Sequence, residues 1–137
     1  MAKLQNKIVT LWTIFLLGTL FHTQLGLMPL FHGQTIVHSH EAGSISWILW
    51  LMLLFFLLPM LAMIGCIFNE SHRYRVVHFG LTVIYSVLNL THLVMDLFVT
   101  PIAWYQIALM AILFGIGLIL NIVAYQWMKK HSLVSYV

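Results

Sequence analysis

Residues 45–68 read ISWILWLMLLFFLLPMLAMIGCIF, an apolar run that contains no charged side chain. About 20 mainly apolar residues are enough for a helix to cross the roughly 30 Å hydrocarbon core of a bilayer. Lipid offers no water to backbone N–H and C=O groups, so a segment of this kind must bond within itself. The run therefore predicts a membrane-spanning helix.

Further apolar stretches on both sides of this run satisfy the same length requirement. The four predicted spans cover residues 8–30, 45–68, 76–99 and 102–128. The connections at 69–75 and 100–101 are short, which favours antiparallel neighbours, whereas a longer loop at 31–44 joins the first two spans. We predict an all-α fold, an integral membrane four-helix bundle with up-down-up-down order, as a single transmembrane domain over residues 1–137.

The composition agrees with a protein that lies in a lipid bilayer. Apolar and aromatic residues make up 62% of the chain and charged residues 7%, whereas soluble domains carry roughly 25% charged residues. This apolar content excludes a disordered chain. Six basic residues are too few for a phosphate-binding stripe, which excludes nucleic-acid binding. The single cysteine cannot form an intramolecular disulfide, so cysteine usage does not indicate the compartment.

The basic residues all fall on one side of the predicted bundle. They are Lys3, Lys7, Arg73, Arg75, Lys129 and Lys130. By the positive-inside rule both termini are expected to be cytoplasmic and the 31–44 loop to lie on the opposite side. Tryptophans near span ends are expected to be interfacial anchors. These are Trp12, Trp47, Trp104 and Trp127.

Polar side chains recur along the third predicted span with helical spacing. They are His78, Thr82, Tyr85, Asn89, His92 and Asp96, at successive intervals of 4, 3, 4, 3 and 4 residues. This spacing places them on one seam that faces partner helices. Thr82, Ser86 and Asn89 are expected to make interhelical hydrogen bonds. Ionisable groups within a span are costly, so His92 and Asp96 indicate a functional site.

The first span contributes a histidine at the same depth as His92. Each of His22 and His92 lies about 10 Å below the outer end of its helix, at 1.5 Å per residue. Diagonal helices of a bundle leave a gap between them, and we interpret His22 and His92 as axial ligands of a b-type haem in that gap. Gly18 and Gly26 lie one turn to either side of His22, where they allow close approach of a bulky ring.

The third span also resembles the haem-carrying helices of the cytochrome b type. His78 and His92 are separated by thirteen residues, and in that family such a pair holds two haems near opposite membrane faces. The resemblance covers one helix, and the second and fourth spans carry no histidine that would complete a second haem site at His78. His78 is therefore expected at the interface, near Arg73 and Arg75.

The loop at 31–44 contains the densest group of ligand-type residues. They are His32, His38, His40 and Glu41. In an extended segment His38 and His40 point the same way, and imidazole suits copper, zinc, iron or nickel. We predict a metal site here, with Glu41 or Asp96 as a carboxylate ligand or as the group that orients a histidine. Copper is the first choice, because the ligands are nitrogen-rich and the outer compartment is oxidising, and zinc is the alternative.

The predicted haem site and the predicted metal site lie close together, and this arrangement resembles haem–copper proteins in a general way. It predicts electron transfer, so an oxidoreductase activity is one hypothesis. The electron partner would be a quinone or another carrier, and a homo-oligomer stays open. Residues considered for a quinone pocket, which equally fit ordinary interhelical hydrogen bonds, are Tyr85, Asn121, Tyr125 and Gln126. One alternative function is haem-free copper or zinc binding. Another is an accessory subunit of a larger membrane complex.

Overall fold

The computed structural model of the protein describes residues 2–33 and 45–130. Within these ranges the chain forms four α-helices and no strand. The helices are α1 (Ala2–Phe31), α2 (Ile45–Phe68), α3 (His72–Asp96) and α4 (Trp104–Lys129). Each helix is long and apolar enough to cross a membrane. The predictions of an all-α fold and of four membrane-spanning segments are confirmed at this level.

The bounds of α3 differ from the predicted 76–99, since the helix begins and ends earlier in the chain. Its start is set by Ser71, whose side-chain oxygen accepts a hydrogen bond from the backbone N–H of Tyr74 at 3.3 Å. This N-cap satisfies one of the backbone donors that a helix start leaves free. The helix ends at Asp96, so this carboxylate lies in the last turn.

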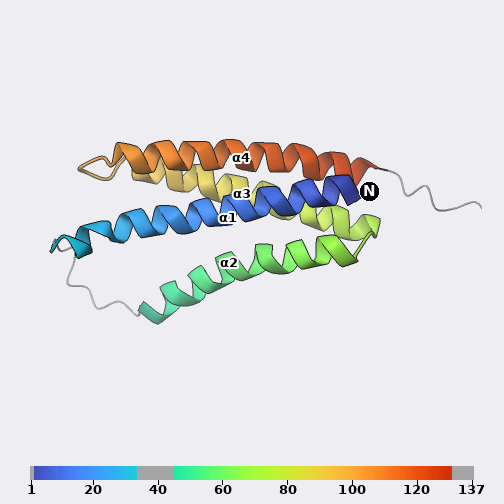
Figure 1. Cartoon of the computed structure of the whole chain (residues 1–137), viewed down its shortest axis with the longest axis horizontal. Coiled ribbons are helices and arrows are strands. Elements are labelled where there is room, and N and C mark those ends of the chain that lie inside the picture. Colours follow the sequence, from blue (N-terminus) through green and yellow to red (C-terminus); the bar gives the residue numbers. More distant parts are fainter. Residues whose placement is uncertain (1, 34–44, 131–137) are drawn as a thin grey trace, which may run out of the picture.

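Helices α1, α3 and α4 lie side by side, and α2 diverges from them toward its own start (Figure 1). Helix α4 packs along both α1 and α3, and α2 makes fewer contacts with its neighbours. Helices α1 and α3 meet through large side chains, as in the edge-to-face contact of Trp12 and Tyr85, whose ring centroids are 5.2 Å apart. Aromatic contacts therefore join α1 to α3.

The polar seam of α3 faces the interior, as the spacing of its residues predicts. The buried residues of this helix are Arg75, His78, Thr82, Tyr85, Ser86 and Asn89. Three of them take part in bonds to α4: Arg75 donates to the carbonyl of Trp127 at 3.2 Å, Asn121 donates to the Ser86 hydroxyl at 2.9 Å, and Asn89 donates to the sulfur of Met110 at 3.9 Å. Interhelical hydrogen bonding of Ser86 and Asn89 is thus confirmed. The prediction is wrong for Thr82, whose hydroxyl donates to the carbonyl of Phe79 within α3 at 2.8 Å.

The residues expected at the two membrane interfaces are only partly there. Trp47 and Trp104 are exposed, but Trp12 and Trp127 are fully buried, so the anchor prediction is wrong for these two. His78 is also buried, 1% exposed, and its Nε2 accepts a hydrogen bond from the indole N–H of Trp12 at 3.2 Å. Three helices enclose this cluster, because the rings of Trp12, His78 and Trp127 pack edge to face.

Tyr85 compensates for a proline inside α2. Pro59 has no backbone N–H and therefore cannot bond the carbonyl of Phe55, which lies four residues earlier. The Tyr85 hydroxyl donates to this carbonyl oxygen at 2.6 Å. In lipid no water would satisfy the freed carbonyl. The bond therefore ties α3 to the middle of α2.

We expect Tyr85→Phe to lower the free energy of unfolding by about 1–3 kcal/mol, because the Phe55 carbonyl then stays buried without a donor. The measurement is unfolding of the detergent-purified protein. Tyr105→Phe is the matched control, since Tyr105 is exposed and donates no hydrogen bond to the described residues. Equal effects of the two changes would contradict this role of Tyr85.

Candidate metal centre

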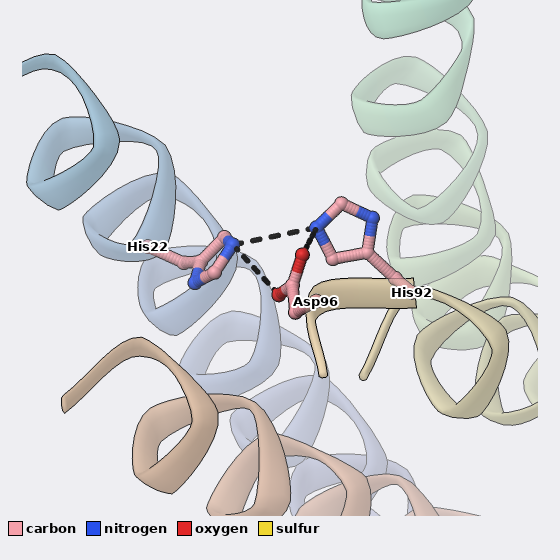
Figure 2. A group of neighbouring side chains, drawn as sticks. All are labelled: His22, His92 and Asp96. Atoms are coloured by element: carbon pink, nitrogen blue, oxygen red, sulfur yellow. Dashed lines mark hydrogen bonds and ion pairs between the residues drawn. The ribbon is translucent and has the colours of Figure 1, made fainter. Parts of the chain in front are cut away.

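Three ligand-type side chains converge where α1 faces the last turn of α3 (Figure 2). His22 comes from α1, and His92 and Asp96 come from α3, one helical turn apart. Residues four apart lie on the same face of a helix, so His92 and Asp96 both point toward α1. The structure thus brings His22 and His92 to one level, as their depths in the sequence predict.

The ligand atoms of the three side chains are close to one another. The two Nε2 atoms of His22 and His92 are 3.4 Å apart. One carboxylate oxygen of Asp96 lies 3.6 Å from Nε2 of His92, and the other lies 3.7 Å from Nε2 of His22. When one ligand atom is taken from each of the three residues, these atoms all lie within 4.8 Å of one another.

The contact between the two histidine Nε2 atoms is itself within reach of a long hydrogen bond, at 3.4 Å, but direct hydrogen bonds otherwise satisfy this group poorly. Strong contacts between a charged imidazole and a carboxylate are about 2.7–2.9 Å long, and both histidine–aspartate distances exceed this range. Nδ1 of His22 and one oxygen of Asp96 are buried and have no hydrogen-bond partner among the described residues. A complete set of hydrogen bonds therefore does not hold the three side chains together.

The spacing matches ligands around a small ion. Metal–nitrogen bonds of about 2.0–2.1 Å in tetrahedral geometry place two ligand atoms about 3.3–3.4 Å apart. The observed distance between the two histidine nitrogens, 3.4 Å, lies at this value. At right angles, as in square-planar geometry, the same bonds would place the atoms about 2.9 Å apart. The histidine pair thus has the spacing of tetrahedral ligands, whereas the two Asp96 contacts, at 3.6 and 3.7 Å to different carboxylate oxygens, are longer than this spacing.

The three side chains differ in exposure. His22 is 13% exposed and Asp96 20%, whereas the His92 side chain is 55% exposed. His22 and Asp96 are therefore held by their surroundings, and His92 lies on the open side of the group.

A cavity of about 350 Å³ adjoins the two histidines. It lies between α1, α2 and α3 and reaches Met110 of α4, with walls that are mostly apolar. Asn89 lines the cavity, and its side-chain oxygen is buried without a hydrogen-bond partner among the described residues. The open side of the histidine pair therefore faces a space of small-molecule size.

The two glycines predicted to make room beside His22 lie against α4. A Cβ atom at Gly18 would collide with the side chain of Leu113, and one at Gly26 would lie 3.7 Å from the amide nitrogen of Gln106. Both positions thus adjoin residues of α4. Close packing of Leu113, which is itself buried, accounts for glycine at position 18.

Of the predicted loop ligands only His32 lies among the described residues, and it is not part of the observed cluster. His32 follows the end of α1 and is exposed; it is ten residues beyond His22, or about 15 Å along a helix. His38, His40 and Glu41 lie outside the described residues. The carboxylate that joins the histidine pair is Asp96, which the sequence singles out for the loop metal instead. The four-residue spacing of His92 and Asp96 is the signal that links them.

Three of the four residues considered for a quinone pocket have other partners, and the fourth, Gln126, is exposed. Tyr85 bonds the Phe55 carbonyl, and Asn121 bonds Ser86. Tyr125 lies on the ring of Phe79 and under the ammonium group of Lys129. The structure therefore brings together His22, His92 and Asp96 as the group with ligand chemistry. Comparisons of this chain with protein-family models, with curated proteins and with solved structures found no match.

Proposed function

We propose that this protein is an integral membrane metal-binding protein in which His22, His92 and Asp96 hold one zinc ion and exchange it with the surroundings. The observation that carries the proposal is the 3.4 Å separation of the two histidine nitrogens, with a carboxylate beside both. Imidazole and carboxylate are zinc ligands, and zinc favours tetrahedral sites. When bound, a zinc ion supplies a Lewis-acid centre with an exchangeable fourth position.

The chain's own residues support exchange better than permanent storage. Structural zinc sites are closed by four protein ligands, and this group has three among the described residues. Asp96 neutralises part of the charge of the ion, and His22 is held on the less exposed side. The more exposed His92 lies where the ion enters and leaves. Copper, which the same donors accept, is the alternative cargo.

We also propose that the helices run up-down-up-down with both termini in the cytoplasm. Hydrogen bonds support this order: Gln5 near the start of α1 donates to the carbonyl of Cys66 at the end of α2 at 2.8 Å. Likewise Arg75 at the start of α3 donates to the carbonyl of Trp127 near the end of α4 at 3.2 Å. All Lys and Arg residues then lie on the cytoplasmic side, and the metal centre lies toward the opposite side.

A membrane redox protein with a b-type haem between His22 and His92 is the second candidate. The observation in its favour is the mostly apolar cavity that both histidines line. Two axial imidazoles in line on one ion lie about 4 Å apart at bonds of about 2.0 Å, farther than the observed 3.4 Å. Haem binding would therefore require α1 and α3 to separate and Asp96 to withdraw.

One sample distinguishes these functions. The detergent-purified protein, free of any histidine tag, is loaded with zinc, dialysed and analysed for metal content, and its visible spectrum is recorded before and after reduction with dithionite. We expect one zinc ion per chain and no visible band. A Soret band with sharp bands on reduction would reject the zinc proposal in favour of the haem protein. Stoichiometric copper with little zinc would overturn the choice of ion.

A protein that retains neither metal nor haem would contradict both candidates. In that case an accessory role in a larger membrane complex would be the remaining hypothesis, with the polar seam of α3 serving assembly. Separate purification from cells supplied with zinc and with haem precursor makes this outcome decisive, because each ligand is then present during folding.

A further inference from the structure

A second cavity, of about 690 Å³, lies at the end of the bundle that carries the basic residues. It is formed where the connection between α2 and α3 meets the end of α4. Its polar lining consists of Glu70, Ser71, His72, Arg75, Lys129 and Lys130. Three side chains with permanent positive charge thus face one with negative charge, and this cavity is separate from the histidine–aspartate cluster.

Arg75 is the unusual member of this lining. It is 1% exposed, and its terminal nitrogens donate to the carbonyl oxygens of Glu70, Trp127 and Lys130. Its Nε atom is buried without a hydrogen-bond partner, and no ion pair joins Arg75 to a carboxylate within the described residues. A buried charge is costly unless it is paired. An anion in the adjacent cavity would supply the missing partner.

The start of α3 adds to the positive potential of the cavity. Ser71 is the N-cap of this helix, and both Ser71 and His72 line the cavity. The first turn of a helix carries free backbone N–H groups and the positive end of the helix dipole, and this favours bound phosphate. The exposed Lys129 and Lys130 line the other side, with the ammonium group of Lys129 lying 4.7 Å from the ring centroid of Tyr125. Buried guanidinium, helix start and two lysines therefore converge on one space.

We propose that this cavity binds the phosphate of an anionic lipid headgroup at the cytoplasmic end of the bundle. Basic pockets between membrane helices on that side suit anionic headgroups, and arginine is well adapted to phosphate oxygens. Free phosphate has the same chemistry, so the two sources must be separated by experiment. The proposal does not depend on the metal centre, because the two groups share no residue.

The test is thermal unfolding of the detergent-purified protein during titration with short-chain phosphatidylglycerol, phosphatidylcholine or inorganic phosphate. We expect saturable stabilisation by phosphatidylglycerol and little by phosphatidylcholine, whose headgroup is neutral overall. The double variant Lys129→Gln/Lys130→Gln should lose affinity about 25-fold, at about fivefold per lysine. The control is Lys3→Gln/Lys7→Gln, which removes the same charge from the start of α1, outside this cavity.

The possible outcomes distinguish a specific anion-binding site from nonspecific electrostatic attraction. Saturable stabilisation by inorganic phosphate alone that is lost in Lys129→Gln/Lys130→Gln would support the anion site and assign it to free phosphate. Equal stabilisation by phosphatidylglycerol and phosphatidylcholine would overturn the proposal. Equal losses in the two double variants would overturn it as well, since nonspecific attraction to the basic end would then explain the binding.

Discussion

Asp96→Asn and His92→Ala are each expected to weaken zinc binding by about 100-fold or more. Loss of groups that merely orient metal ligands already costs about 10–100-fold in metal affinity, and here a ligand itself is removed from a set of three. Asparagine keeps the size of Asp96 but lacks the negative charge that faces both imidazoles at 3.6 and 3.7 Å. The change therefore tests the charge with little change in packing.

The measurement is competition for zinc between the detergent-purified variants and a chelator of known affinity. Saturating zinc should also raise the unfolding temperature of the unmodified protein, because an ion that binds only the folded state stabilises it, by about 2.7 kcal/mol at a concentration of 100 times Kd. The variants should lose this shift. Stabilisation follows because the ion would join α1 to α3 through His22 and His92.

His72→Ala is the matched control for the metal variants. His72 is exposed at the start of α3, at the opposite end of that helix from His92, and is not part of the cluster. Its replacement should leave zinc affinity near that of the unmodified protein. If His72→Ala lost as much affinity as His92→Ala, zinc would be bound by histidines in general and the assigned centre would be wrong.

Arg75→Ala is expected to lower the free energy of unfolding by about 3 kcal/mol or more. Arg75 donates to the carbonyl of Trp127 at 3.2 Å, to that of Glu70 at 3.0 Å and to that of Lys130. Hydrogen bonds from a charged group contribute roughly 1.5–3 kcal/mol each, and buried acceptors left without a donor add a further cost. The start of α3 would then lose its link to the end of α4.

Unfolding of the detergent-purified variants measures this effect, with Arg73→Ala as the control. Arg73 is two residues from Arg75 but is exposed, so its replacement should change stability by no more than about 0.5 kcal/mol. Arg75→Lys keeps the positive charge but loses the planar set of donors, and it should fall between the two. Similar stabilities of the alanine variants would show that the carbonyl bonds contribute little.

The depth of a residue within a predicted span allowed some long-range contacts to be anticipated. His22 and His92 lie at equal distances from the outer ends of their helices, and the structure brings their nitrogens to 3.4 Å. The repeating polar positions of α3 likewise predict a buried seam, which is observed. Both successes rest on the fixed rise and rotation per residue of an α-helix, which need no knowledge of the neighbours.

The depth of a residue within its span did not predict burial for side chains that have both a polar and an apolar part. Trp12 and Trp127 lie near span ends and fit the usual position of interfacial anchors, yet both are buried around His78. Arg75 was grouped with the basic residues of one membrane side, and it is also buried. Whether such a residue faces lipid or protein depends on which helices pack against that face, and periodicity within one helix does not specify this.

The sequence by itself determined that the chain forms four apolar helices, because a chain with so little charge must satisfy its backbone internally in lipid. It also determined which face of α3 is polar. Only the tertiary structure decided that Asp96 completes the group at His22 and His92 and that Arg75 lies beside a cavity without a carboxylate partner. Distances between side chains of different helices depend on how the helices approach one another, and packing of the whole bundle sets that approach.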